Sequence, residues 1–331
     1  MVSEKNEKEK LVIELRWDPL LEEWVMVSNI REARPWRPQS FCPFCPGAPE
    51  MGYGWKVKIV ENKFPMLIEN APRVEPHWFY RKAEARGKCL VVVETPEHDL
   101  DDISDLDLDS IVLVIREVIR AMKEYMDKDW AKYFFWFRNK GEEIGVSLKH
   151  PHSQIYILPF IPVRVERELR SAKKYYDERR ECLFCRIIQV EETDNERVVF
   201  RTTKWISFIP FYAHWPFEVH IYPRRHVQLL TELDNEEIRE LALSIKRVLQ
   251  GLKALFNKPV PYMMIFHQAP LRGSYPYYHL HVEIYGVYRP SGKLKYAAGM
   301  ESGGGNFTYD SVPEKNAQKL RDAINSISSY K

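Results

Sequence analysis

The sequence predicts an α+β protein built from two tandem copies of one module, each an antiparallel sheet that carries one long helix. The chain of 331 residues has room for two modules of about 150 residues, each with its own core. The same cysteine and histidine residue set occurs in both halves in the same order. In each half, strand-type runs and one long run with helical spacing also follow in the same order.

In the first half the predicted elements begin with a hairpin and end with a strand that follows a histidine-rich loop. Seven apolar residues at helical spacing predict the helix, with Ser104 as its N-cap. The predicted strands are Leu11–Leu15, Glu23–Ser28, Cys89–Glu94, Tyr133–Phe137 and Ile155–Leu158, the helix is Asp105–Met126, and residues 139–141 form a turn.

The second half repeats this order, with a long helix that we expect Thr231 to cap. The predicted strands are Trp205–Ile209, Val219–Tyr222, Tyr262–Phe266 and His281–Tyr285, and the helix is Asn235–Phe256. The charged, helix-prone segment Arg164–Arg180 connects the modules. We therefore expect module boundaries at 1–163 and 164–331.

Composition narrows the class of protein. A net charge of +2 argues against a dedicated nucleic-acid binder. No apolar run reaches the roughly 18 residues of a membrane helix, and the charged first ten residues do not resemble a signal peptide. We expect a cytoplasmic protein that contacts neither nucleic acid nor membrane.

A metal site is predicted in the first half. Two cysteines in a Cys-x-x-Cys pair and two spaced histidines form a tetrahedral zinc ligand set: Cys42, Cys45, His98 and His150. Four protein ligands leave no open position, so this zinc would be structural. The alternatives are a redox dithiol or unpaired core cysteines. Cys89, inside an apolar run, is expected to be a plain core residue.

His152 is the candidate catalytic residue. It lies two positions after His150, so in an extended segment both side chains point to the same side. An imidazole held beside a metal site but outside the metal sphere is a candidate nucleophile, and histidine attacks phosphorus readily. Gln154 would point the same way and donate to a phosphoryl oxygen. A packed or solvent-facing ring is the alternative.

The second half keeps the metal ligands but changes the residues after them. His226 precedes His279 by 53 residues, as His98 precedes His150 by 52. A second structural zinc is therefore predicted at Cys182, Cys185, His226 and His279. His281 stands in the place of His152, but Val282 and Glu283 follow it instead of Ser153 and Gln154. This copy is expected to be structural, with His267 as a further ligand or pocket residue.

From about Trp24 to the C-terminus, the chain resembles the galactose-1-phosphate uridylyltransferase family of the histidine-triad superfamily. The motifs that carry the resemblance are Glu23–Ser28 with Arg31 and Arg34-Pro35, then Asn62-Lys63-Phe64, Arg138–Gly141 with Gly145 and Ser147, and His150-Pro151-His152. The resemblance implies two tandem histidine-triad-like modules.

The resemblance also implies roles for these residues. Arg31 and Arg34 would bind a nucleotide diphosphate, and Asn62 and Phe64 would contact ribose and base. Asn139, Gly145 and Ser147 would form the phosphate-binding stretch. His152 would carry the uridylyl group, and Gln154 would steady the intermediate.

Two further features follow from the resemblance. Residues 295–301 resemble the family's sugar-phosphate loop, which implies substrate roles for Lys295, Tyr296 and Glu301 and a homodimer with shared active sites. Some members build the second metal site from a glutamate and three histidines, and the matching set here is Glu168, His267, His279 and His281. Because thiolates select zinc strongly, we favour the cysteine-containing set.

The expected activity is therefore transfer of UMP from UDP-glucose to galactose-1-phosphate through a uridylyl-histidine intermediate, with zinc as a structural cofactor. One alternative is an ADP-glucose phosphorylase or adenylyltransferase of the same superfamily, a branch that the run Gly303–Gly305 resembles. The others are a hydrolase and a non-catalytic zinc-ribbon-like binding protein. The sugar-phosphate loop argues against the hydrolase, and the stretch from Asn139 to Gln154 against the binding protein.

Overall fold

The computed structural model describes residues 11–33 and 42–328. The elements of the first half run from a hairpin to a strand that follows the His-Pro-His segment. They are β1 (Ile13–Asp18), β2 (Glu23–Ser28), β3 (Lys58–Glu61), β4 (Lys82–Glu84), β5 (Lys88–Val93), α1 (Leu108–Tyr125), β6 (Tyr133–Lys140) and β7 (His152–Leu158).

The second half opens with two helices and closes with another. Its elements are α2 (Val163–Arg179), α3 (Leu183–Asp194), β8 (Val198–Arg201), β9 (Trp205–Phe208), β10 (Phe217–Pro223), α4 (Asn235–Phe256), β11 (Tyr262–His267), β12 (His281–Gly286) and α5 (Pro313–Ser328).

One antiparallel sheet of nine strands runs through both halves, in the order β3-β5-β7-β6-β11-β12-β10-β9-β8. The halves meet where β6 pairs with β11, with Phe137 opposite Ile265. On either side of this pair the strand order is the same, so the modules are related by an approximate two-fold axis. The predicted class, two modules each with an antiparallel sheet and a long helix, is confirmed. The fusion of the two sheets was not predicted.

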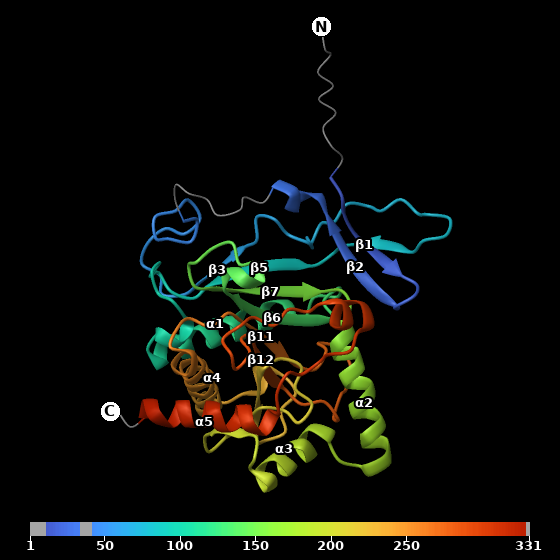
Figure 1. Ribbon diagram of the computed structural model, residues 1–331. Coiled ribbons are helices and arrows are strands. Elements are labelled where there is room, and N and C mark those ends of the chain that lie inside the picture. Colours follow the sequence, from blue (N-terminus) through green and yellow to red (C-terminus); the bar gives the residue numbers. More distant parts are fainter. Residues whose placement is uncertain (1–10, 34–41, 329–331) are drawn as a thin grey trace.

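The sheet has a separate apolar core on each face. Figure 1 shows α1, α4 and α5 together on one side of the sheet and α2 on the other. On the first side Trp136 and Ile155 pack with Leu241 of α4. On the other, Tyr133 and Val165 share a core with β1 residues of the small sheet β2-β1-β4. Cys89 belongs to this second core and is buried, as predicted.

Both predicted helix caps are wrong. The N-cap of α1 is Asp107, whose carboxylate accepts from Ser110 N at 2.8 Å, and Ser104 lies in a preceding 3₁₀ turn. α4 begins with a capping box, in which Asp234 accepts from the Glu237 amide at 2.7 Å. Thr231 precedes it in another 3₁₀ turn. In both cases an aspartate three residues further along supplies the acceptor that the helix start needs.

The expected turn at residues 139–141 is also corrected. Asn139 and Lys140 continue β6 because they pair with β11, and the chain turns only at Gly141, where φ is +109°. A side chain at Gly141 would bring its Cβ to 2.5 Å from Pro261. Glycine therefore permits both the positive φ and the close approach of the loop before β11.

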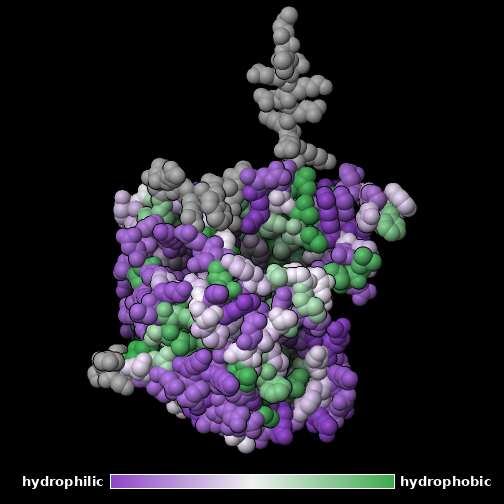
Figure 2. All heavy atoms as spheres, viewed as in Figure 1, coloured by the Kyte–Doolittle hydropathy of each residue, from purple (hydrophilic) through white to green (hydrophobic). Residues whose placement is uncertain are grey.

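The surface visible in Figure 2 is mainly hydrophilic, with separate hydrophobic spots. Such scattered spots are usual on a globular protein. Among the described residues, no helix is both long and apolar enough to cross a membrane.

Candidate active site and metal centres

His152 is the first residue of β7 and projects from the face of the sheet that is opposite α1 and α4. The pairing of Phe137 with Gln154 places Asn139, His152 and Gln154 on this face, because alternate residues of a strand point to the same side. The side chain of His152 is half-buried and lies 5.3 Å, between ring centroids, from Phe44 of the first Cys-x-x-Cys loop. The loop and the strand thus bring metal ligands and catalytic candidate together.

The tautomer of His152 follows from one contact. Its Nδ1 lies 2.8 Å from the main-chain oxygen of His150. A carbonyl oxygen only accepts, so Nδ1 carries the proton and the lone pair of the neutral ring is on Nε2. This arrangement suits a nucleophile. The hydrogen bond that Nδ1 donates keeps the proton there, and Nε2 is thereby left as the reacting nitrogen.

The four predicted ligands of the first metal group converge. Their ligand atoms all lie within 4.8 Å of one another. Cys45 Sγ lies 3.3 Å from His98 Nδ1, and Cys42 Sγ lies 3.6 Å from His150 Nδ1. Tetrahedral zinc, with bonds of about 2.3 Å to sulfur and about 2.05 Å to nitrogen, separates these atoms by about 3.6 Å. The group therefore fits a tetrahedral metal ion.

Neighbouring groups orient these ligands. His150 is buried and its Nε2 donates to Thr95 O at 2.8 Å, so Nδ1 faces the cysteines with its lone pair. Burial lowers the pKa of His150, which keeps the ring neutral. Burial also raises the pKa of Cys42 to about 11. A dication would reverse that shift, since coordinated thiols lose their proton.

The second Cys-x-x-Cys group repeats this geometry. Cys185 Sγ lies 3.4 Å from His226 Nδ1 and 3.5 Å from His279 Nδ1. His279 Nε2 donates to Pro223 O at 2.9 Å, as His150 does to Thr95. Cys182 completes the group and precedes α3 as its N-cap residue.

The alternative ligand set for the second metal is not assembled. His279 has both ring nitrogens engaged, with Cys185 and Pro223, and so cannot join Glu168 and His267. Glu283 takes its place in a third, buried group with Glu168, His267 and His281. The group with Cys182, Cys185, His226 and His279 and the group with Glu168, His267, His281 and Glu283 are therefore separate and share no residue.

This third group distinguishes the second module from the first. His281 occupies the position of His152 and likewise donates from Nδ1 to the carbonyl two residues before it, at 2.9 Å. Its Nε2, however, faces Glu283 at 3.5 Å, and the ring is 1% exposed. Glu168 of α2 accepts from His267 at 3.0 Å, which closes this face. Buried carboxylates there disfavour an anionic ligand.

A cavity of about 860 Å³ opens beside His152 at the end of β6. It is lined by residues of both modules, among them Asn139, Gly141, Ser147, His152 and Pro261. Gly145 turns the loop between β6 and β7 at a φ of +82°. Of the predicted phosphate-binding stretch, Asn139 and Ser147 thus border the same cavity as the candidate nucleophile.

Asn62 connects the predicted base-contacting segment to Gln154. Asn62 Nδ2 donates to Gln154 Oε1 at 3.3 Å, and Asn62 Oδ1 accepts from Phe64 N at 2.9 Å. A smaller hollow of about 590 Å³ adjoins Asn62 and Lys63. Arg31 lies on the same face, with Nη1 3.4 Å from Tyr156 Oη, whereas Arg34 lies outside the described residues.

The predicted sugar-phosphate loop is held by its own charged residues. Lys295 is 3% exposed and donates to the main-chain oxygens of His214, at 3.0 Å, and Thr308. Glu301 accepts from the Thr308 hydroxyl at 2.7 Å. Tyr296 is 63% exposed. Of the three predicted substrate residues in this loop, only Tyr296 presents its side chain to solvent.

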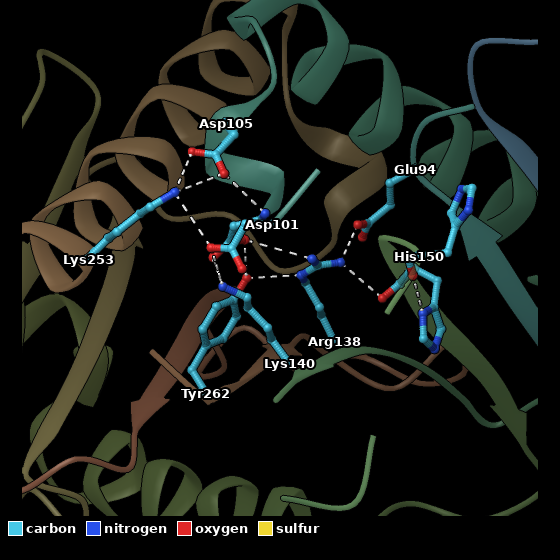
Figure 3. Close-up of polar contacts among 10 residues, drawn as sticks. Glu94, Asp101, Asp105, Arg138, Lys140, His150, Lys253 and Tyr262 are labelled. Carbon is cyan, nitrogen blue, oxygen red and sulfur yellow. Dashed lines mark hydrogen bonds and ion pairs between the residues drawn. The ribbon is translucent and has the colours of Figure 1, made fainter. Parts of the chain in front are cut away.

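Sequence reasoning missed a buried ion pair beside the site. Glu94 ends the apolar run of β5, and Arg138, 3% exposed, lies near the end of β6; they form an ion pair. Figure 3 shows Arg138 at the centre of a network that includes Glu94 and Tyr262. The available signal was a charged residue at or near the end of an apolar strand, in β5 and again in β6, the two strands that flank β7.

The fold and the paired ligand groups define a class of two-module α+β proteins, in which each module sets a Cys₂His₂ group beside a His-x-His segment. Two family models match the chain, the N-terminal domain of galactose-1-phosphate uridyl transferase over residues 3–162 and its C-terminal domain over residues 168–330. The chain therefore belongs to the galactose-1-phosphate uridyl transferase family.

Curated relatives agree with this membership. The galactose-1-phosphate uridylyltransferase of Thermotoga maritima is 38% identical over 318 residues, which is 94% of this chain and 98% of the relative. The ADP-glucose phosphorylase of Arabidopsis thaliana is 30% identical over 339 residues, or 93% and 92% of the two chains.

Solved structures give the same order of similarity. A structure described as uridylyltransferase superposes with a TM-score of 0.90 at 50% identity, covering 95% of this chain and 99% of that one. The Arabidopsis thaliana ADP-glucose phosphorylase with bound ADP-glucose superposes with a TM-score of 0.73 at 28% identity, covering 93% and 98%.

Proposed function

We propose that this enzyme moves UMP from UDP-glucose to galactose-1-phosphate in two steps, with His152 as the residue that carries the uridylyl group. The observation that supports this most directly is the tautomer of His152, whose Nδ1 donates a hydrogen bond to the His150 carbonyl. The identity to the Thermotoga maritima enzyme, 38% against 30% for the ADP-glucose phosphorylase, supports the uridylyl reading.

In the first step, the Nε2 lone pair of His152 attacks the α-phosphorus of UDP-glucose, and the bond to the glucose-1-phosphate oxygen breaks. The ring becomes cationic as the N–P bond forms. The carbonyl of His150, 2.8 Å from Nδ1, stabilises that charge through the hydrogen bond that is already in place. Glucose-1-phosphate leaves, and an oxygen of galactose-1-phosphate then takes the uridylyl group from Nε2.

Neighbouring side chains are assigned to binding. Gln154 Oε1 accepts from Asn62, which leaves the Gln154 NH₂ group as the donor for a phosphoryl oxygen. Ser147 and Asn139 border the cavity beside His152 and would contact phosphate without adding charge. Arg31, with Arg34, would bind the diphosphate, and Phe64 the base.

Zinc at the two Cys₂His₂ groups would be structural and would hold Cys42, Cys45, His98 and His150 on the first module and their counterparts on the second. The support is the donor set and the ligand spacing of both groups. In this proposal residues 1–163 carry the catalytic groups, and residues 164–331 carry the second zinc and the sugar-phosphate loop.

The proposal includes a cytoplasmic homodimer in which the loop at residues 295–301 reaches the partner's site. The family resemblance and the exposed side chains of Tyr296 and Met300 in that loop support it. Light scattering on the purified protein tests the dimer, and a monomeric mass at working concentration would contradict it.

The activity is tested by incubating purified protein with UDP-glucose and galactose-1-phosphate, beside a control with ADP-glucose and inorganic phosphate. We expect UDP-galactose and glucose-1-phosphate from the first pair. Release of ADP from the control pair, with no turnover of the first, would instead assign the enzyme to the ADP-glucose phosphorylase branch.

A further inference from the structure

Arg138 is a buried cation directly beneath the nucleophile segment. Since Phe137 shares a sheet face with His152, Arg138 projects from the opposite face, toward α1. It is 3% exposed although it borders the cavity, and its guanidinium contacts Glu94, Tyr262 and the main chain of His152. Burying a charged guanidinium costs free energy of desolvation, so a role is needed to explain an arginine at this position.

The guanidinium donates a hydrogen bond to the nucleophile segment where the pairing of β6 with β7 ends. Pro151 O accepts from Glu94 N at 3.2 Å and is therefore directed toward β5. The next carbonyl, that of His152, is directed toward β6 because carbonyls alternate along a strand. The pairing of β6 with β7 stops at Phe137 and Gln154. Arg138 Nη1 donates to His152 O at 3.0 Å, beyond the end of this pairing.

Three successive carbonyls of the nucleophile segment are thereby fixed. His150 O accepts from His152 Nδ1, Pro151 O from Glu94 N, and His152 O from Arg138. Glu94 and Arg138 form an ion pair with each other, so the two groups that hold the second and third carbonyls are locked together. Both partners of one buried pair therefore act on one peptide segment.

The pair is anchored in the second module. Arg138 Nε donates to Tyr262 Oη at 2.9 Å, and Tyr262, on β11, donates to Asp102 at 2.8 Å. Figure 3 shows the network continuing through Asp101 to Lys253, a residue of α4. Guanidinium orientation is thus fixed from both modules.

The module fold does not by itself require this arginine. His267 pairs with His281, so Phe266 holds in the second module the place that Arg138 holds in the first. That module forms the same strands with an apolar residue there, beside a histidine that carboxylates surround. Of the two modules, the one that contains the candidate nucleophile has an arginine at this position and the other has a phenylalanine.

We propose that Arg138 is a positioning residue, whose guanidinium, oriented by Glu94 and Tyr262, fixes the His152 carbonyl and with it the line of attack of the imidazole on phosphorus. This inference rests on the proposed function. Arg138 itself does not contact the reacting atoms. Its loss would slow formation of the nucleotidyl-enzyme more than it weakens substrate binding, because small misplacements of a reacting group cost rate.

The test measures single-turnover formation of nucleotidyl-enzyme from UDP-glucose labelled at the α-phosphate, as a function of UDP-glucose concentration. Arg138→Lys keeps the charge opposite Glu94 but loses the planar fork. The double variant Arg138→Met with Glu94→Gln removes the guanidinium that donates to His152 O and leaves neither charge of the ion pair unpaired. The matched control is Arg197→Lys, which alters another buried pair, with Glu191 at 3.0 Å, in the second module.

We expect the limiting rate of Arg138→Lys to fall about 10-fold to 100-fold, with half-saturation and zinc content as in the wild type. The double variant should keep thermal stability close to wild type yet remain as slow. Arg197→Lys should lose stability without losing rate. Recovery of rate in the double variant, or an equal loss of rate in Arg197→Lys, would show a merely structural role. Absence of labelling in the wild type would instead overturn the proposed function.

Discussion

Replacing His152 with asparagine separates the chemistry of this residue from its structural contacts. The asparagine amide can still donate to His150 O, where His152 Nδ1 donates at 2.8 Å, but it has no counterpart of Nε2. The substitution removes the contact with Phe44, at 5.3 Å between centroids, and aromatic pairs contribute about 0.5–1.5 kcal/mol. We therefore expect a loss of about 1 kcal/mol in the free energy of unfolding and a loss of transfer of about 10⁴-fold or more.

Three measurements are made on the same preparation, namely UDP-galactose formation, zinc per chain and the thermal midpoint. The matched control is His281→Asn, because His281 makes the same contact with the carbonyl of His279, at 2.9 Å, in the second module. This control should retain transfer. It should lose more stability than His152→Asn, since His281 is buried against Glu283.

The reasoning would be refuted if His152→Asn still formed UDP-galactose at a rate near that of the wild type. Loss of zinc from His152→Asn, with His150 intact, would also refute it, because His152 would then be a ligand and not the nucleophile.

Three further predictions concern the metal, acid stability and helix packing. Cys45→Ser should lose one zinc per chain by elemental analysis, together with transfer; unchanged zinc would contradict the first ligand group. Burial raises the pKa of Glu218, but hydrogen bonds from His214 and His220 lower it to about 2 from the ordinary 4.5. Its contribution, about 3 kcal/mol, is present above pH 4.5 and lost as the pH falls to 2, so Glu218→Gln should flatten acid denaturation there; an unchanged slope would contradict this. Gly251→Ala would place Cβ 2.4 Å from a side chain of α5 and should cost about 1–3 kcal/mol in chemical denaturation, whereas stabilisation would contradict the packing.

The ligand groups were predictable from the sequence because their residue types and spacing are distinctive and occur twice. Two cysteines spaced by two residues, followed by two histidines about 50 residues apart, are typical of a zinc site, and both groups converge as expected. The long amphipathic helices could also be predicted from the sequence, and α4 has the predicted bounds. Their caps were mistaken because several polar residues near each helix start can accept the same hydrogen bonds, and Asp107 and Asp234 do so.

The pairing of strands from the two halves could not be predicted from the sequence. The pairing of β6 with β11 joins strands whose alternation resembles that of any other strand here, so the fused sheet has no sequence signature. The helices α3 and α5 were missed for a related reason, because their helical state depends on tertiary packing more than on propensity.

Buried charge pairs posed the same difficulty. Arg138 was assigned to a phosphate-binding motif, but its partner Glu94 lies 44 residues earlier in the chain. Likewise, Glu283 was noted only as a difference from Gln154, although it completes a buried group with Glu168 and His267. Sequence spacing identifies which residues can carry charge, whereas only the fold determines which of them meet.

The central claim, that His152 carries a uridylyl group, is tested most directly by intact-protein mass spectrometry after incubation with UDP-glucose alone, followed by peptide mapping. The account predicts one added uridylyl group per chain, on the peptide that contains His152, which disappears when galactose-1-phosphate is added. No adduct, an adduct on another residue, or an adenylyl adduct formed only from ADP-glucose would contradict it.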